Sequence, residues 1–108
     1  MTAKLIVLYK KPADTKAFDD HYFNIHVPLA EKMPGLIKSS YSRITGSPMG
    51  QPGFYLMAEL TFDSQEALQQ ALASPEGRAA GKDVMGFAGD LVHMMFADVV
   101  DTPAGISG

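Results

Sequence analysis

The stretch that decides the fold is FYLMAELTF, from Phe54 to Phe62. Successive side chains of a β-strand point to opposite faces, so the nine residues fall into two sets. The first set is entirely apolar: Phe54, Leu56, Ala58, Leu60 and Phe62. The second set is mixed: Tyr55, Met57, Glu59 and Thr61. The alternation predicts a strand with one face on a hydrophobic core and a second face too apolar to be fully exposed to water.

Apolar runs and turn signals on both sides of this strand extend it into a βαββαβ pattern. The predicted elements, in chain order, are a strand at 5–9, a helix at 14–33, strands at 37–45 and 54–62, a helix from Asp63 or Ser64, a short helical turn at 74–76, a short helical or looped stretch at 83–89, and a strand at 91–100. Asp14 is the predicted N-cap of the first helix. Glu66 stands at capping-box spacing from Asp63.

The first helix has one apolar face, and its residues recur at helical spacing: Phe18, Tyr22, Ile25, Leu29 and Met33. Pro28 interrupts the pattern, because it has no N–H to donate to the carbonyl of Asn24 and its ring crowds that carbonyl. The residue before a proline is also disfavoured in helical geometry. We therefore expect a kink or a break near Val27, directly beside His26.

The βαββαβ order predicts the ferredoxin-like α+β fold, a four-stranded antiparallel sheet with both helices on one face. The last strand, Leu91–Val100, is apolar along nearly its whole length. The second sheet face therefore needs a cover, and a second copy of the same sheet is the simplest one. We expect a homodimer that forms an α+β barrel. Residues 1–101 are expected to form the domain and residues 102–108 a short flexible tail.

Composition excludes several classes of protein. The 108 residues are 46% hydrophobic and 19% charged, which excludes a disordered chain. The net charge is −3 and the basic residues are scattered, so no nucleic-acid partner is expected. There is no cysteine, which excludes disulfides, thiolate catalysis and thiolate-bound metals. The N-terminal apolar run, Leu5–Tyr9, is too short for a signal peptide or a membrane span, so we expect a cytoplasmic protein without a membrane partner.

Short motifs along nearly the whole chain resemble the EthD family of the dimeric α+β barrel superfamily. The matching segments are Leu8–Pro12, His21-Tyr22, His26–Ala30, Met33–Leu36, Tyr41–Arg43, Phe62–Ser64, Ser74–Glu76 and Lys82–Phe87. Each segment is a weak signal alone, but their order and spacing together are specific. The resemblance implies the barrel dimer and a pocket for a flat or cyclic organic molecule. It also implies activities that range from an accessory role beside a monooxygenase in ether degradation to isomerisation and decarboxylation.

His26 is the first candidate catalytic residue, because it occupies the place of the family's motif histidine, two residues before a proline. The resemblance implies that this histidine lines the pocket. On an α-helix His26 lies about 40° from Tyr22, so the imidazole and the phenol are a candidate proton-transfer pair. The alternative is that His26 supports the kinked helix by bonding a backbone carbonyl. His21 lies about 140° from His26 and is expected to face solvent or a subunit contact.

Tyr41 and Arg43 share one face of the second strand and are also candidate catalytic residues. If that face lines the pocket, Tyr41 would bond a substrate oxygen and Arg43 would hold a carboxylate or an enolate. The alternative is an ion pair between Arg43 and Glu59 across the strands. If Glu59 points into the barrel, it is expected to be ion-paired or to act as an acid or base.

The candidate substrate-binding residues are Tyr9, Met57, Glu59, Phe87 and His93. Core packing is the alternative for the apolar members of this set. His93 is more typical of a core or interface residue, although some members of the superfamily bind heme through a histidine. Asp83 is expected to cap a short helix. No phosphate-binding loop, nucleophile elbow or metal-ligand cluster is recognisable, so we expect no cofactor and no metal.

Three functions follow as hypotheses. The leading one is a cofactor-independent isomerase, cyclase, decarboxylase or oxygenase that acts on a small cyclic, aromatic or oxygenated metabolite, with His26 as base or acid. The second is a non-catalytic protein that holds or delivers such a molecule to a monooxygenase system. The third is a structural domain without a ligand cavity.

Overall fold

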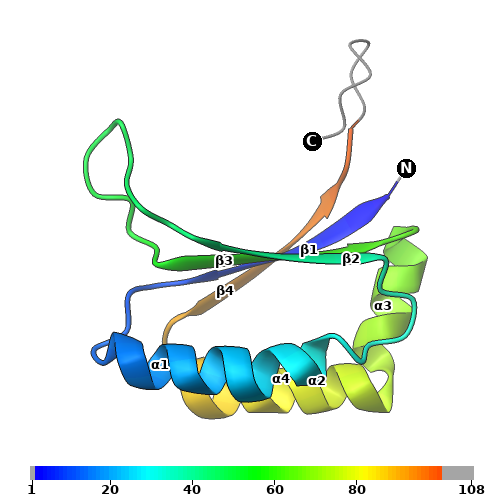
Figure 1. Ribbon diagram of the computed structural model, residues 1–108. Coiled ribbons are helices and arrows are strands. Elements are labelled where there is room, and N and C mark those ends of the chain that lie inside the picture. The colour runs from blue at the N-terminus through cyan, green and yellow to red at the C-terminus, as the bar shows by residue number, and fades with distance from the viewer. Residues whose placement is uncertain (1, 101–108) are drawn as a thin grey trace.

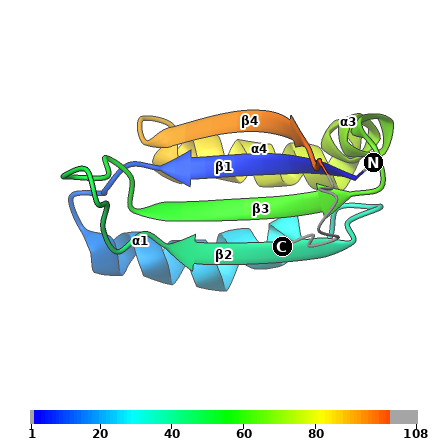
Figure 2. The same cartoon turned by 90° about the horizontal axis from the view of Figure 1, so that it is seen from above.

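The fold is a four-stranded antiparallel sheet with the helices on one face (Figure 1). The computed structural model describes residues 2–100. Its elements are β1 (Ala3–Tyr9), α1 (Thr15–His21), the π-helix η1 (Tyr22–His26), α2 (Val27–Ala30), β2 (Lys38–Arg43), β3 (Leu56–Phe62), α3 (Gln65–Ala73), α4 (Pro75–Ala88) and β4 (Val92–Asp98). The strand order is β2-β3-β1-β4 (Figure 2). This confirms the ferredoxin-like α+β class. The predicted tail and the boundary at residue 101 lie outside the described residues.

The two central strands, β1 and β3, carry the core. Their register pairs Ala3 with Phe62 and Tyr9 with Leu56, and along both strands buried residues alternate with partly exposed ones. All the buried residues of β1 and β3 face the helices, as the alternation predicts. Burying each large apolar side chain contributes roughly 1.5–3 kcal/mol, so this inner face accounts for much of the stability.

The predicted strand is wrong at its first two residues. A bend precedes β3, so the strand begins at Leu56. The Tyr55 hydroxyl donates to the carboxylate of Asp19 on α1 at 2.9 Å and therefore lies on the helix side of the sheet. The Phe54 ring instead contacts the ring of His93, at 5.6 Å between centroids. Because side chains alternate with a period of two, one bend is enough to exchange the faces of these two aromatic residues.

The first helix runs through Pro28 without breaking, but it changes its winding. Asp14 caps α1 by accepting from the N–H of Ala17, as predicted. The five residues of η1 have π-helical hydrogen bonding, in which the N–H of Val27 donates to the carbonyl of Tyr22. A π-bulge is one of the standard ways in which a helix absorbs a local irregularity, and here it lies directly before the proline. The predicted kink near Val27 is therefore a local widening of the helix.

The widened turn also changes which residues reach the core. Ile25 was expected on the buried face, yet 49% of its surface is exposed. His26 is buried in its place, with 6% of its surface exposed, and Ala30 is buried one turn later. The extra residue in the π turn shifts the buried face by one position relative to an ideal α-helix.

The second helical segment differs from the prediction of short separate pieces. Ser64, one of the two predicted candidates, caps α3, so the capping-box spacing from Asp63 is not used, and Ser74 caps α4. α4 is a single helix of 14 residues whose buried positions are Gly77, Ala80, Val84 and Ala88. Asp83 lies inside this helix and does not cap one. At Gly77 the absence of a side chain lets α4 pack closely on α3.

The other side of the sheet is left uncovered by residues 2–100, and we call it the open face (Figure 2). Its apolar and aromatic members are Ile6, Leu8, Met57, His93 and Met95. Met95 on the edge strand β4 has 42% of its surface exposed. In the part of the chain that the structure describes, no helix is long and apolar enough to cross a membrane.

Candidate functional site

A small cavity of about 60 Å³ lies between the sheet and the helices. Its walls include Val7 and Tyr9 from β1, Met94 from β4, Met33 after α2, Val84 from α4, and His26. The lining is apolar apart from the imidazole of His26 and the hydroxyl of Tyr9. An apolar cavity with few polar groups is the usual composition of a site for a small organic molecule.

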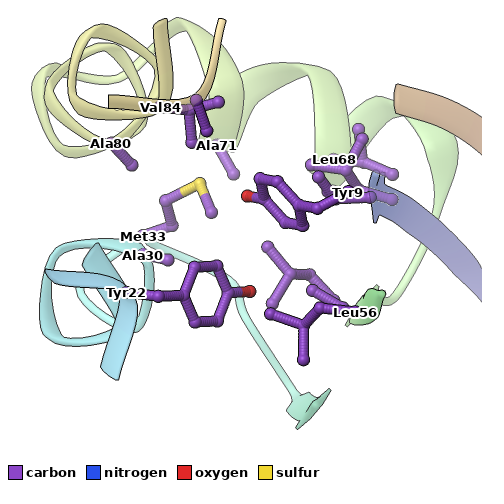
Figure 3. Packing of buried hydrophobic residues seen from close by; sticks show 14 of the residues in the cluster. Tyr9, Tyr22, Ala30, Met33, Leu56, Leu68, Ala71, Ala80 and Val84 are labelled. Atoms are coloured by element: carbon purple, nitrogen blue, oxygen red, sulfur yellow. The ribbon is translucent and has the colours of Figure 1, made fainter. Parts of the chain in front are cut away.

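Tyr9 lines this cavity, and its phenol ring packs against that of Tyr22 in the core (Figure 3). Their ring centroids are 5.3 Å apart with the planes at 77°, and both residues are 1% exposed. Burial raises the pKa of both phenols well above the usual range, and the Tyr22 hydroxyl, hydrogen-bonded to that of Tyr9, partly opposes this effect at Tyr9. Both hydroxyls are therefore neutral hydrogen-bond donors at physiological pH.

His26 is held by a carboxylate on the facing helix. Its Nδ1 lies 3.1 Å from Oδ2 of Asp83. Burial lowers the pKa of His26, and the hydrogen bond and the charge of Asp83 only partly oppose this effect. The imidazole is therefore neutral near pH 7. A carboxylate can only accept, so Nδ1 carries the proton and Nε2 is left as the basic nitrogen.

Asp83 is the residue of this cluster that the sequence interpretation misplaced. Its carboxylate also accepts from Nε2 of His21, at 2.9 Å to Oδ1 and 3.1 Å to Oδ2. His21 was expected to face solvent or a subunit contact; its side chain is 31% exposed, and its ring nitrogen bonds Asp83 on α4. The sequence signal that could have located Asp83 is the helical spacing of Gly77, Ala80, Val84 and Ala88, which spans Asp83 and contains no proline.

Phe87, one turn after Asp83, packs on the same cluster. Its ring centroid is 4.2 Å from that of His21 and 5.7 Å from that of His26. It also contacts the Phe18 ring, at 5.5 Å. Phe87 therefore covers the hydrogen-bonded side of the two histidines, and it does not line the cavity itself.

Tyr41 and Arg43 lie on the helix side of β2 but toward its rim. Arg43 donates to Asp19 on α1 at 3.0 Å and is half-exposed. The Tyr41 hydroxyl donates to Glu31 at 3.3 Å, and burial raises the pKa of Tyr41 to about 12. The alternative ion pair between Arg43 and Glu59 is wrong, because the two residues are on opposite faces of the sheet.

Three predicted substrate-binding residues lie on the open face: Met57, Glu59 and His93. Glu59 is paired with Lys4 at 3.1 Å. The sheet therefore separates these residues from the cavity beside His26.

Of the predicted site residues, the structure brings together Tyr9, Tyr22 and His26. Phe87 packs against His26 but does not line the cavity. Within residues 2–100 no group of three histidine or acidic side chains is arranged to hold a metal ion.

Comparison with known proteins agrees with this architecture. The family model described as "EthD domain" matches residues 10–90. An 11.0 kDa protein from the thcB–thcC intergenic region of Rhodococcus erythropolis is 38% identical over 95 residues, covering 88% of this chain and 92% of the relative. The crystal structure of an EthD-family protein from Bacillus halodurans is 53% identical and has a TM-score of 0.87; the match covers 91% of this chain and 98% of that one.

A more distant structural neighbour is a cofactor-independent oxygenase from Streptomyces nogalater. It is 12% identical, has a TM-score of 0.69, and matches over 94% of this chain and 96% of its own. At this identity the likeness concerns the fold alone.

Proposed function

The chain belongs to the EthD family, and from this premise we propose that it binds a small, oxygenated, cyclic or aromatic organic molecule. His26 acts as the base that removes a proton from this molecule. The observation that carries the proposal is the state of His26. It is buried, it lines the cavity, and Asp83 holds its Nδ1. A neutral imidazole with one nitrogen tied to a carboxylate is suited to accept a proton at the other nitrogen.

The proposed step is a proton transfer without a cofactor. Nε2 of His26 takes a proton from a C–H or O–H bond of the substrate, and the electron pair of that bond remains on the substrate as an enolate or phenolate. The neutral hydroxyl of Tyr9, which lines the cavity, donates a hydrogen bond to the developing oxyanion, and the Tyr22 hydroxyl supports it by donating to Tyr9. His26 then returns the proton to another atom, which completes an isomerisation or a cyclisation. In a decarboxylation, His26 takes the proton of a carboxylic acid, the C–C bond breaks to release carbon dioxide, and His26 returns the proton to the carbanion. In an oxygenation, dissolved O₂ oxidises the substrate anion, and the peroxide that forms takes the proton from His26.

The cavity limits the size of the substrate. About 60 Å³ is well below the roughly 150 Å³ of an engineered cavity that holds benzene. A cyclic ligand therefore requires movement of the lining, and Met33 and Met94 are the adaptable side chains in it. We further propose that a second copy covers the open face, because its apolar residues are otherwise left in water.

The small cavity also supports the second candidate, an accessory protein that holds a small molecule for a monooxygenase system without converting it. The two functions differ in one respect, which is turnover. An accessory protein would bind the molecule and would be indifferent to the basicity of His26.

A small unsaturated lactone, α-angelica lactone, tests the proposal because its double bond migrates after loss of a ring proton. We expect the protein in D₂O to accelerate deuterium uptake at the ring carbon, measured by NMR. The His26→Gln variant should lose about 100-fold or more of this rate, the usual contribution of a general base. Lys16→Gln, on the exposed side of α1, is the matched control. Saturable binding of the lactone without exchange would overturn the proposal and favour the accessory role.

A further inference from the structure

His21, Asp83 and His26 form a continuous chain of hydrogen bonds from the surface to the cavity. The exposed fractions of their side chains are 31%, 17% and 8%, in that order. The proposed function uses only the inner end of this chain. We propose that His21 is a positioning residue for His26 and acts through the carboxylate of Asp83, an inference that rests on the proposed role of His26 as the base.

The π turn is what allows both histidines to reach one carboxylate. In an α-helix, two residues five positions apart point about 140° away from each other. In η1 the hydrogen bonds join residues five apart, as in the bond from Val27 to Tyr22. Residues at this spacing then lie above one another, so His21 and His26 both face Asp83 on α4. The π turn therefore lets His21 and His26, which would point apart on an α-helix, bond the same carboxylate, that of Asp83.

His21 restrains Asp83 more tightly than His26 does. Its Nε2 lies within hydrogen-bond distance of both carboxylate oxygens, whereas His26 contacts only Oδ2. The Phe87 ring, 4.2 Å from the His21 ring between centroids, holds that imidazole in place. Without His21 the carboxylate would keep one protein partner and could rotate. His26 would then lose the fixed acceptor that keeps the proton on Nδ1.

Charge gives His21 a second effect on His26. The groups that face His26 are Asp83 from α4, His21 from α1, Tyr22 from η1 and Tyr9 from β1. Burial lowers the pKa of His26, Asp83 raises it, and the charge of His21 lowers it. The two phenols stay neutral, because burial raises the pKa of both.

Two substitutions separate the effects of His21. His21→Phe keeps a ring against Phe87 but removes the donor to Asp83. His21→Gln keeps an N–H donor but removes the charge that an imidazole can carry. The readout is the ¹⁵N NMR spectrum of the His26 ring across pH, together with the deuterium-exchange rate on α-angelica lactone. Asp20→Asn, which changes a charge beside His21 without contact to Asp83, is the control.

In the His21→Phe variant, neutral His26 should be a mixture of the Nδ1–H and Nε2–H tautomers. The deuterium-exchange rate should fall about tenfold. The His21→Gln variant should keep the Nδ1–H form, and the titration midpoint of His26 should move to higher pH. An unchanged His26 tautomer in His21→Phe would overturn the inference. If that variant does not fold, His21→Ala, which also removes the donor to Asp83, takes its place, and an unchanged His26 tautomer there overturns the inference instead. The NMR spectrum reports the His26 tautomer without any turnover. The positioning role of His21 can therefore be tested even if His26 proves not to be the base.

Discussion

At the scale of the residue, His26 carries the proposed chemistry because two opposing effects act on its pKa. Burial lowers the pKa of His26, and the hydrogen bond and charge of Asp83 partly oppose this lowering. A histidine near a proline in a family motif could be recognised in the sequence. Its partner could not, because Asp83 is 57 positions away in sequence from His26. Pairing at that separation depends on how α4 packs against η1.

The lowered pKa of His26 predicts how stability depends on pH. The unfolded chain takes up a proton near pH 6.5, whereas the folded chain does so only at lower pH. The unfolded state thus binds more protons between the two pKa values, so the free energy of unfolding falls as the pH drops below about 6.5. The slope from this group is at most about 1.4 kcal/mol per pH unit.

Urea unfolding between pH 7.5 and pH 5 measures this slope. The His26→Leu variant should show a flatter dependence than the parent protein, because its side chain takes up no proton in either state. An equally steep fall in both proteins would assign the effect to other groups.

At the scale of the element, the contact of α3 with α4 depends on Gly77. A Cβ atom built there would overlap the carbonyl oxygen of Ala71 and lie 2.8 Å from the Cα of Leu72, both backbone atoms. We predict that Gly77→Ala lowers the free energy of unfolding by about 1–3 kcal/mol, the usual cost of overpacking. Chemical denaturation measures this change.

Gly86 on the same helix is the matched control for that substitution. Its Cβ would meet nothing within 4 Å, and the residue is exposed. Gly86→Ala should therefore raise the free energy of unfolding by about 1 kcal/mol through helix propensity. Destabilisation of equal size at both positions would contradict the explanation by close packing.

Element identities followed from periodicity, but some of their details did not. The alternation of β3 and the cap at Asp14 were readable because they depend on neighbours in the sequence. The bend before Leu56 and the π turn before Pro28 were not, since each exchanges the face on which a side chain lies through a shift of one residue. The π turn changed the outcome for Ile25 and His26, and the bend changed it for Phe54 and Tyr55.

At the scale of the whole molecule, the open face leads to a prediction about assembly. Met95 lies in the middle of β4, opposite Ile6, with 42% of its surface exposed. If a second copy covers this face, Met95→Glu would bury an unpaired charge and weaken self-association by about 30-fold or more. Sedimentation velocity over a range of concentrations measures this change.

Met85→Glu is the control for that experiment. Met85 is 62% exposed on α4, on the opposite side of the molecule from the open face. This variant should associate as the parent protein does. Equal sedimentation of the parent and Met95→Glu proteins, both as monomers, would contradict the homodimer.

The sequence by itself determined the ferredoxin-like topology and the family, because alternation, helix caps and motif order are encoded in residues close together along the chain. Only the tertiary structure decided which predicted site residues meet. It placed Met57, Glu59 and His93 behind the sheet, away from His26, and it brought Asp83 and His21 to that histidine. The physical reason is that a carboxylate shared by two histidines depends on the winding of one helix and its packing against another, and neither is a property of a local stretch of sequence.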